Sequence, residues 1–173
     1  MSRENTVIYL IHPPDIEFID PEIKKNFGVE RSISITKALI TKTYSKIKKM
    51  NYMMVLGYSR SKKFFDLRWL DHDEPGFLET DGLSYSSAFN KVAEYAFRVG
   101  AKSVVWVNHL CPFIENGDLA LAFSNIRERQ IVIGPAANKG IYLLGFNREL
   151  FRIIGETIIS PVTCLLYTSP SPR

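Results

Sequence analysis

Cysteine and histidine are scarce in this sequence of 173 residues, which contains two cysteines and three histidines. Cys111 and Cys164 can build neither a disulfide framework nor a structural zinc centre, so we expect reduced thiols and a cytoplasmic protein. Long apolar runs are missing too. No stretch approaches the roughly 20 residues that cross a bilayer, and residues 1–5 do not resemble a signal peptide. The composition therefore excludes a disulfide-rich scaffold and predicts no membrane partner.

Positive charge is only slightly in excess, with 22 Lys and Arg against 18 Asp and Glu and a net charge of +4. Much of the excess lies in residues 24–49, where a basic helix face could bind phosphate or nucleic acid. Aromatic residues that could stack on bases do not alternate with these lysines. We therefore interpret the stretch as a solvated helix face and do not expect nucleic acid as a partner.

The last ten residues, 164–173, differ from the rest of the chain. They contain two Ser-Pro steps and no periodicity, and they resemble the translated adaptor ending that is fused to unrelated reading frames in assembled sequence data. The sequence thus predicts a single domain at 1–163 followed by a non-native tail, with a native chain that is C-terminally truncated. A natural flexible C-terminus is the alternative.

Apolar runs and helical periodicities alternate along the domain, and no internal repeat interrupts them. This alternation predicts an α/β fold with an open, doubly wound, mostly parallel sheet and helices on both faces. Expected strands cover 6–11, 52–57, 103–107, 130–134 and 141–145. Expected helices run from Ser32 or Ser34 to about 50, from 83 to 99, onward from an N-cap at Asp118, and from 148 to 154. Between these elements we expect a polar loop at 15–30 and a turn at 71–76. Residues 61–70 are ambiguous and could form a short helix.

Ligands of such sheets bind outside the carboxyl ends of the strands, at the point where the strand order reverses. The loops at 12–31, 108–117 and 135–140 follow or precede expected strands at that edge. They are therefore the places where the sequence predicts a binding site.

Several short motifs in the second half of the chain recur in one order. They are Asp81-Gly82-Leu83 with Ala88-Phe89, Cys111-Pro112, Ile-Val-Ile-Gly-Pro-Ala at 131–136 and Gly-Ile-Tyr-Leu-Leu-Gly-Phe at 140–146. Over residues 82–160 this order resembles the glycosyltransferase-like family related to arsenosugar-biosynthesis transferases, which has a nucleotide-diphospho-sugar transferase fold of the glycosyltransferase-A type. The resemblance is weak over residues 1–80.

The resemblance implies sugar transfer from a nucleotide-sugar donor, with an acid-bound Mg²⁺ or Mn²⁺ against the diphosphate and a basic pair in the first loop. Those charges are replaced here. The metal-binding aspartate falls on Leu110, a second acid falls on Phe113, and the basic pair falls near Asp-Pro-Glu-Ile at 20–23, where two residues are acidic. We therefore expect a retained fold with a degenerate donor site, and a divalent metal only if the site is active. The positions implied for nucleotide binding are Asp81, Gly82, Asn108, Leu110, Asn138, Lys139 and Gly140.

Other interpretations stay open at this stage. Glu115 and Asp118 are either metal ligands or a loop acid and a helix N-cap. Lys139 is a possible phosphate ligand that needs no metal. Cys111 is either a thiol activated by His109 or a small buried residue beside a loop histidine. Residues 71–74 are either metal ligands or a solvated turn. At the level of function, the alternative to a divergent glycosyltransferase-like protein is a non-catalytic binding or scaffold protein that retains the fold.

Overall fold

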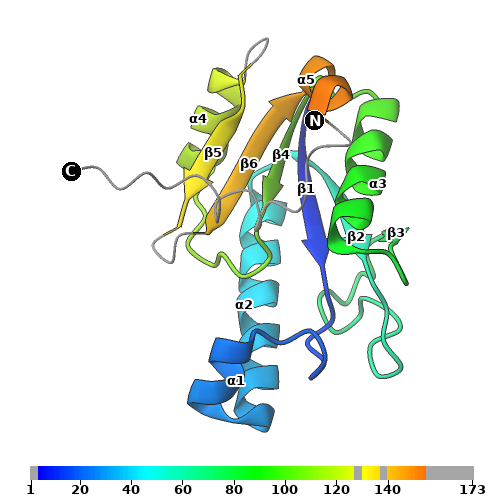
Figure 1. The fold of residues 1–173 in the computed structure, drawn as a ribbon, viewed down its shortest axis with the longest axis vertical. Helices are drawn as coiled ribbons and strands as arrows, with labels where there is room; N and C mark the ends of the chain where they lie inside the picture. Colours follow the sequence, from blue (N-terminus) through cyan, green and yellow to red (C-terminus); the bar gives the residue numbers. More distant parts are fainter. Residues whose placement is uncertain (1–3, 127–129, 137–139, 155–173) are drawn as a thin grey trace, which may run out of the picture.

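A single six-stranded sheet forms the centre of the molecule, with the strand order β3-β2-β1-β4-β6-β5 (Figure 1). The computed structural model describes residues 4–126, 130–136 and 140–154. The strands are β1 (Asn5–Ile11), β2 (Met53–Tyr58), β3 (Leu78–Glu79), β4 (Ser103–Val107), β5 (Val132–Pro135) and β6 (Ile141–Asn147). The helices are α1 (Pro21–Phe27), α2 (Val29–Lys49), α3 (Tyr85–Arg98), α4 (Asn116–Asn125) and α5 (Arg148–Ile154).

Strand β1 lies in the middle and pairs in parallel with β2 on one side and β4 on the other. Strand β3 extends the parallel part beyond β2. Strand β6 is antiparallel to both β4 and β5. Five of the six strands of the described sheet therefore run in one direction, which confirms the mostly parallel sheet that the sequence predicts.

Helices cover both faces of the sheet. The side chains of β1 alternate between these faces and so belong to two separate cores. Val7, Tyr9 and Ile11 pack with α2 and α4, in what we call the α2-side core. Ile8 and Leu10 pack with α3 and α5, in the α3-side core. Figure 1 shows α2 passing behind the sheet, with α3 in front of it. A strand that is buried on both faces has a nearly unbroken apolar sequence, as β1 does.

The expected polar loop at 15–30 is wrong, since α1 and the start of α2 occupy it. The carboxylate of Asp20 caps α1 by accepting a hydrogen bond from the backbone N–H of Glu22 at 2.7 Å, and Pro21 is the first helical residue. Gly28, at φ +73°, links α1 to α2. Helix α2 thus begins at Val29, ahead of the serine caps that we predicted.

Two other local expectations are corrected by the structure. Residues 61–70 form turns with no helix. The N-cap of α4 is Glu115, and Asp118 lies at the third helical position, where its carboxylate accepts from the Glu115 backbone N–H at 2.9 Å. This reciprocal arrangement is a capping box, so both acids stabilise the helix start. Within the described residues, each helix is too short or too polar to span a bilayer.

Candidate functional site

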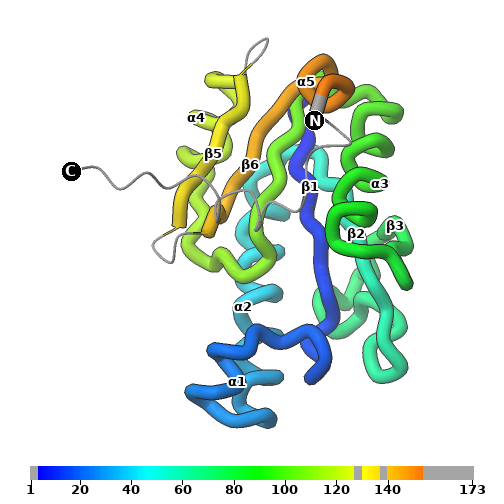
Figure 2. Tube along the Cα trace, viewed as in Figure 1, coloured from blue at the N-terminus to red at the C-terminus, as the bar shows by residue number. Residues whose placement is uncertain are grey.

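The reversal point of the sheet lies between β1 and β4. From β1 the chain crosses to β2 by way of α2 on one face, and it enters β4 by way of α3 on the other. The carboxyl ends of both strands point to the same edge, which lies above α1 in the view of Figure 2. We call this the carboxyl edge. In open α/β sheets the diverging loops at such a point leave a crevice for a ligand.

The loop after β4 is fixed to its neighbours by main-chain and side-chain hydrogen bonds. The Asn108 backbone N–H donates to the Tyr142 carbonyl of β6 at 2.8 Å. The Asn108 side-chain oxygen accepts from the Leu110 backbone N–H at 2.9 Å. From β1, the Tyr9 hydroxyl lies 3.1 Å from the His109 carbonyl oxygen. Asn108 therefore shapes the loop, and its side-chain oxygen is already engaged.

Leu110 and Phe113, the two apolar replacements, lie in different environments. Leu110 is partly buried and packs against the α2-side core. Phe113 is 80% exposed, with the Lys42 ammonium 5.8 Å from its ring centroid. Position 110 thus contributes to the core, whereas position 113 lies on the surface.

Asp81 and Gly82 follow β3 at the same edge but on the far side of β2. The Asp81 carboxylate accepts hydrogen bonds from the Arg60 backbone N–H and from Arg60 Nε, both at 2.7 Å. Burial acts to raise the pKa of Asp81, but the hydrogen bonds from Arg60 hold it below its usual value. Arg60 also contacts Glu79 at 3.0 Å. Asp81 is therefore a clamp between the loops after β2 and β3, and Gly82, at φ +70°, supplies the turn into α3.

The ends of the hairpin between β5 and β6, Ala136 and Gly140, reach the carboxyl edge from the other side. These ends are joined by a hydrogen bond from the Ala136 N–H to the Gly140 carbonyl at 2.9 Å. Asn138 and Lys139, which the sequence predicts as ligand contacts, lie outside the described residues. Of the predicted positions, the structure thus places Asn108, Leu110 and Gly140 at the carboxyl edge, while Asp81 and Gly82 flank this edge at β3.

The centre of the carboxyl edge is occupied by two histidines. His12 follows β1 and His109 follows β4, and their ring centroids are 6.4 Å apart at an interplanar angle of 78°. The His12 ring also stacks on Phe18, with centroids 5.0 Å apart, and lies 5.8 Å from the ring of Tyr85. Sequence reasoning treated His12 only as the end of a strand. Its position directly after the central strand was the available signal.

Both imidazoles lie in apolar surroundings that disfavour a positive charge. Burial lowers the pKa of His12. Burial, and to a lesser degree the proximity of His12, lowers the pKa of His109 to about 3. Each Nδ1 atom is buried and has no hydrogen-bond partner among the described residues. Burial therefore favours the neutral form of both rings, and each ring has one nitrogen without a hydrogen-bond partner among the described residues.

The other constellations considered from the sequence have structural roles. Cys111 packs against the α2-side core, and burial raises the pKa of its thiol, which opposes nucleophilic use. Asp71 accepts from the Tyr44 hydroxyl at 2.8 Å and from Lys48 at 2.6 Å, so it ties its loop to α2. The basic stretch is thus partly engaged, since Lys48 serves this ion pair.

The acidic metal site that the family resemblance implies does not fit the described residues. At the expected positions stand a core leucine and an exposed phenylalanine, while the nearby Asp81 is bound to Arg60. Within the described part of the chain, no group of three or more His, Cys, Asp or Glu side chains converges to hold an ion. We therefore derive no chemistry from a carboxylate-bound Mg²⁺ or Mn²⁺.

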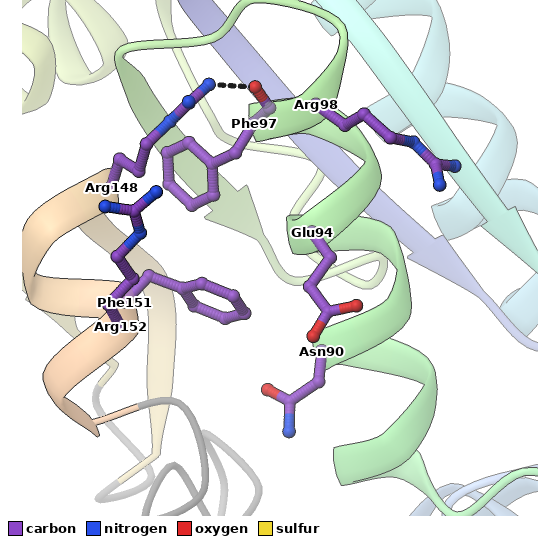
Figure 3. Close-up of a pocket in the computed structure, with 7 residues that line it drawn as sticks. All are labelled: Asn90, Glu94, Phe97, Arg98, Arg148, Phe151 and Arg152. Carbon is purple, nitrogen blue, oxygen red and sulfur yellow. Dashed lines mark hydrogen bonds between the residues drawn. The ribbon is translucent and has the colours of Figure 1, made fainter.

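A separate pocket of about 380 Å³ lies between α3 and α5 (Figure 3). Arg148 spans it by donating to the carbonyl of Phe97 at the end of α3, and its guanidinium lies 5.8 Å from the Phe97 ring. This contact satisfies a carbonyl of the last helical turn, so it docks α5 on α3. The lining residues are Asn90, Glu94, Phe97, Arg98, Arg148, Phe151 and Arg152.

Comparison with known proteins agrees with this architecture. Residues 79–155 match the family described as uncharacterized protein conserved in bacteria, DUF2064. No curated protein matches the sequence. A proposed nucleotide-diphospho-sugar transferase from Desulfovibrio desulfuricans G20 superposes with a TM-score of 0.71 at 18% identity, over 86% of this chain and 65% of that one. This chain thus spans less than two thirds of the length of that protein.

Two further structures have the same arrangement of elements. A nucleotidyl transferase from Methanothermobacter thermautotrophicus gives a TM-score of 0.67 at 11% identity, covering 96% of this chain and 82% of its own. The 4-diphosphocytidyl-2C-methyl-D-erythritol synthase from Anaerococcus prevotii DSM 20548 gives 0.54 at 7% identity, covering 96% and 78%. At these identities the likeness establishes the fold. The chain therefore has a nucleotide-diphospho-sugar transferase-like fold, and its residues 79–155 match the DUF2064 family.

Proposed function

We propose that this protein binds a nucleotide or nucleotide-sugar at the carboxyl edge, as a divergent glycosyltransferase-like protein whose acidic donor site is degenerate. The fold supports nucleotide binding, because the structural neighbours are nucleotide-processing transferases. The single observation that carries the degenerate site is Leu110, which packs into the α2-side core at the position expected for the metal-binding aspartate.

The binding surface consists of the loops that meet at the reversal point of the sheet. These are the loop after His12, the loop at 108–113 and the hairpin ending at Gly140. Aromatic rings beside His12, among them Phe18 and Tyr85, give this surface an apolar centre suited to a flat ring. Charged groups lie at its flank, in the Arg60–Asp81 clamp. An apolar centre of this kind fits a base or a sugar.

Titration with uridine and guanosine diphosphates and with their sugar derivatives tests this proposal. We expect each bound ligand to stabilise the protein by about 2.7 kcal/mol at a concentration of 100 times its Kd, without dependence on added Mn²⁺. Hydrogen–deuterium exchange locates the ligand, and we expect protection at 12–20 and 108–113 but none at α5. Stabilisation that requires Mn²⁺ would contradict the degenerate acidic site.

The second candidate is a non-catalytic binding or scaffold protein that retains the fold. The same loss of charge at position 110 favours it. It predicts that none of the nucleotides alters the thermal midpoint or the exchange pattern, an outcome that would reject nucleotide binding.

A further inference from the structure

The pocket between α3 and α5, which we call the α3–α5 pocket, lies at the opposite edge of the sheet from the proposed nucleotide site. Helix α5 follows directly after Asn147, which pairs with Ser103, the first residue of β4. Helix α3 ends at the same edge, because it leads into β4. The pocket volume of about 380 Å³ lies within the roughly 300–1,000 Å³ that is usual for small-molecule sites. The pocket can therefore hold a small ligand, at a distance from the carboxyl edge that is set by the length of β4.

The α5 wall of this pocket is positively charged. Arg148 and Arg152 lie four residues apart on α5, a spacing that places two side chains on one face of a helix and makes their like charges repel. Figure 3 shows both guanidinium groups directed toward α3. Among the described residues, neither arginine forms an ion pair with a carboxylate. Arg148 donates to the Phe97 carbonyl, but a guanidinium has five N–H donors, so both arginines retain donors for an anion.

The α3 wall carries the opposite charge, on Glu94. In Figure 3 the Phe97 and Phe151 rings lie between the two arginines and the Glu94 carboxylate. Within the described structure Glu94 forms no ion pair, so the pocket keeps these opposite charges apart. Arg98 also lines the pocket, but its side chain points away from α5 in Figure 3, and its guanidinium lies 5.3 Å from the Tyr95 ring. The pocket thus has a cationic side on α5 and an anionic side on α3.

The floor between the charged walls is apolar. Phe97 and Phe151 are buried, and their ring centroids are 5.4 Å apart. A molecule that complements this arrangement has a carboxylate, an apolar body and an ammonium group, which are the three parts of a free amino acid with an apolar side chain. A simple anion would be repelled by the Glu94 carboxylate, and a simple cation by the two arginines. These repulsions favour a ligand that carries both charges.

We propose that the α3–α5 pocket binds a free α-amino acid with an apolar side chain. Its carboxylate accepts hydrogen bonds from the guanidinium groups of Arg148 and Arg152, and its ammonium group donates to the Glu94 carboxylate. Its side chain lies on the Phe97 and Phe151 rings. This site goes beyond the function proposed above and does not depend on it, because the two sites lie at opposite edges of the sheet.

Calorimetric titration of the full chain with L-phenylalanine tests the proposal. We expect one equivalent to bind. Phenylpropionate lacks the ammonium group and phenylethylamine lacks the carboxylate, so each should bind roughly 10-fold or more weakly than L-phenylalanine, as expected for the loss of one charged hydrogen bond. Failure of L-phenylalanine to bind, or equal affinity for all three compounds, would overturn the proposal.

Two variants remove the charges of the pocket one at a time. Arg152→Gln and Glu94→Gln should each weaken L-phenylalanine binding by roughly 10-fold or more. Arg148 is left in place because it docks α5 on α3. Lys91→Gln is the matched control, since it removes a charge from α3 outside the pocket, and it should leave the affinity unchanged. Glu94→Gln should not weaken the binding of phenylpropionate, which has no ammonium group to lose a partner.

Hydrogen–deuterium exchange of the unaltered chain locates the amino acid and covers the case in which a substitution unfolds the protein. We expect L-phenylalanine to protect α3 and α5 and to leave the loops at 12–20 and 108–113, where nucleotides should act, unchanged. Protection confined to those loops, or unchanged affinity in the folded Arg152→Gln/Glu94→Gln double variant, would reject this site. Because nucleotides and the amino acid are read out at different segments, the failure of one proposal is distinguishable from the failure of the other.

Discussion

A carboxylate introduced at position 110 would lie against apolar side chains, because Leu110 packs on the α2-side core. Leu110→Asp therefore should not restore a metal site. We expect it to lower the free energy of unfolding by about 2 kcal/mol, the cost of burying an unpaired polar group. Urea denaturation monitored by circular dichroism measures the change.

Phe113→Asp is the matched control, since it introduces the same charge three residues later on a side chain that is 80% exposed. Its effect should stay within about 0.5 kcal/mol. Equal stability of the two variants would show that position 110 tolerates charge and that its role in the core is overestimated.

Asp71 gives a prediction about acid stability. Its hydrogen bonds to Lys48 and Tyr44 lower the pKa of its carboxyl from the ordinary 3.8 to about 2. A carboxylate whose pKa is depressed on folding stabilises the protein above its unfolded pKa, and the contribution disappears as pH falls toward the folded value. Asp71→Asn should thus be less stable than the unaltered chain at pH 7.

The difference should shrink between about pH 4 and pH 2, as the carboxyl of the unaltered chain becomes protonated. Denaturation curves at pH 7, 4 and 3 record this trend. Asp73→Asn is the control, because that carboxylate is 3.7 Å from Lys48 and 88% exposed. A stability difference for Asp71→Asn that does not change with pH would contradict the assignment.

At the candidate site, sequence reasoning could find the ends of strands but not the contacts that the loops make. It located the loops at the carboxyl edge, because strand ends are visible in the apolar pattern. It could not show that the Asp81 carboxylate is bound by Arg60, since residues 60 and 81 meet only through the pairing of β2 with β3. The His12–His109 pair was missed for the same reason, as these residues are distant in the chain and adjoin only across paired strands.

Strand β2 and helix α3 approach closely at Gly57. A Cβ atom there would lie 2.6 Å from Val92 Cγ2 and 2.7 Å from Leu10 Cδ1, and both side chains are fully buried. Gly57→Ala should therefore overpack the α3-side core and destabilise the protein by about 1–3 kcal/mol. Chemical denaturation measures the loss.

Gly76→Ala serves as the comparison, because no atom lies within 4 Å of the added Cβ. It should be neutral or slightly stabilising, since alanine restricts the unfolded chain. Equal unfolding free energies for the two alanine variants would contradict the close approach of α3 to β2.

Elements with a strong periodic signal were predictable from sequence. The strand at 103–107 and the helix at 148–154 have the predicted bounds. Helix α1 was missed because it contributes no buried side chain and so has no apolar stripe. Its signal was local, an aspartate followed by a proline, which is typical of a helix start. Strand β3 has only two residues and depends on its pairing with β2, which no short window of sequence reveals.

The whole molecule has two cores that share the strands of one sheet. Ile40 of α2 and Phe89 of α3 are fully buried on opposite faces, and the side chains of β1 contribute to both cores. We therefore expect a single cooperative unfolding transition. Ile40→Ala should lower the unfolding free energy by about 2–5 kcal/mol, and Phe89→Ala by about 3–5 kcal/mol.

Far-ultraviolet circular dichroism and tryptophan fluorescence, recorded on the same denaturation series, check this expectation. The two signals should coincide in both variants. A biphasic curve in either variant would mean that the two faces unfold separately.

The central place of β1 has a consequence for the order in which the protein is made. A ribosome synthesises this strand before its two flanking partners, which begin only at Met53 and Ser103. Until β4 has been synthesised, one edge of this fully buried strand stays unpaired and open to association with other chains. Cellular production of this protein should accordingly depend on holdase chaperones that shield the emerging amino-terminal segment until the second half of the sheet has been translated.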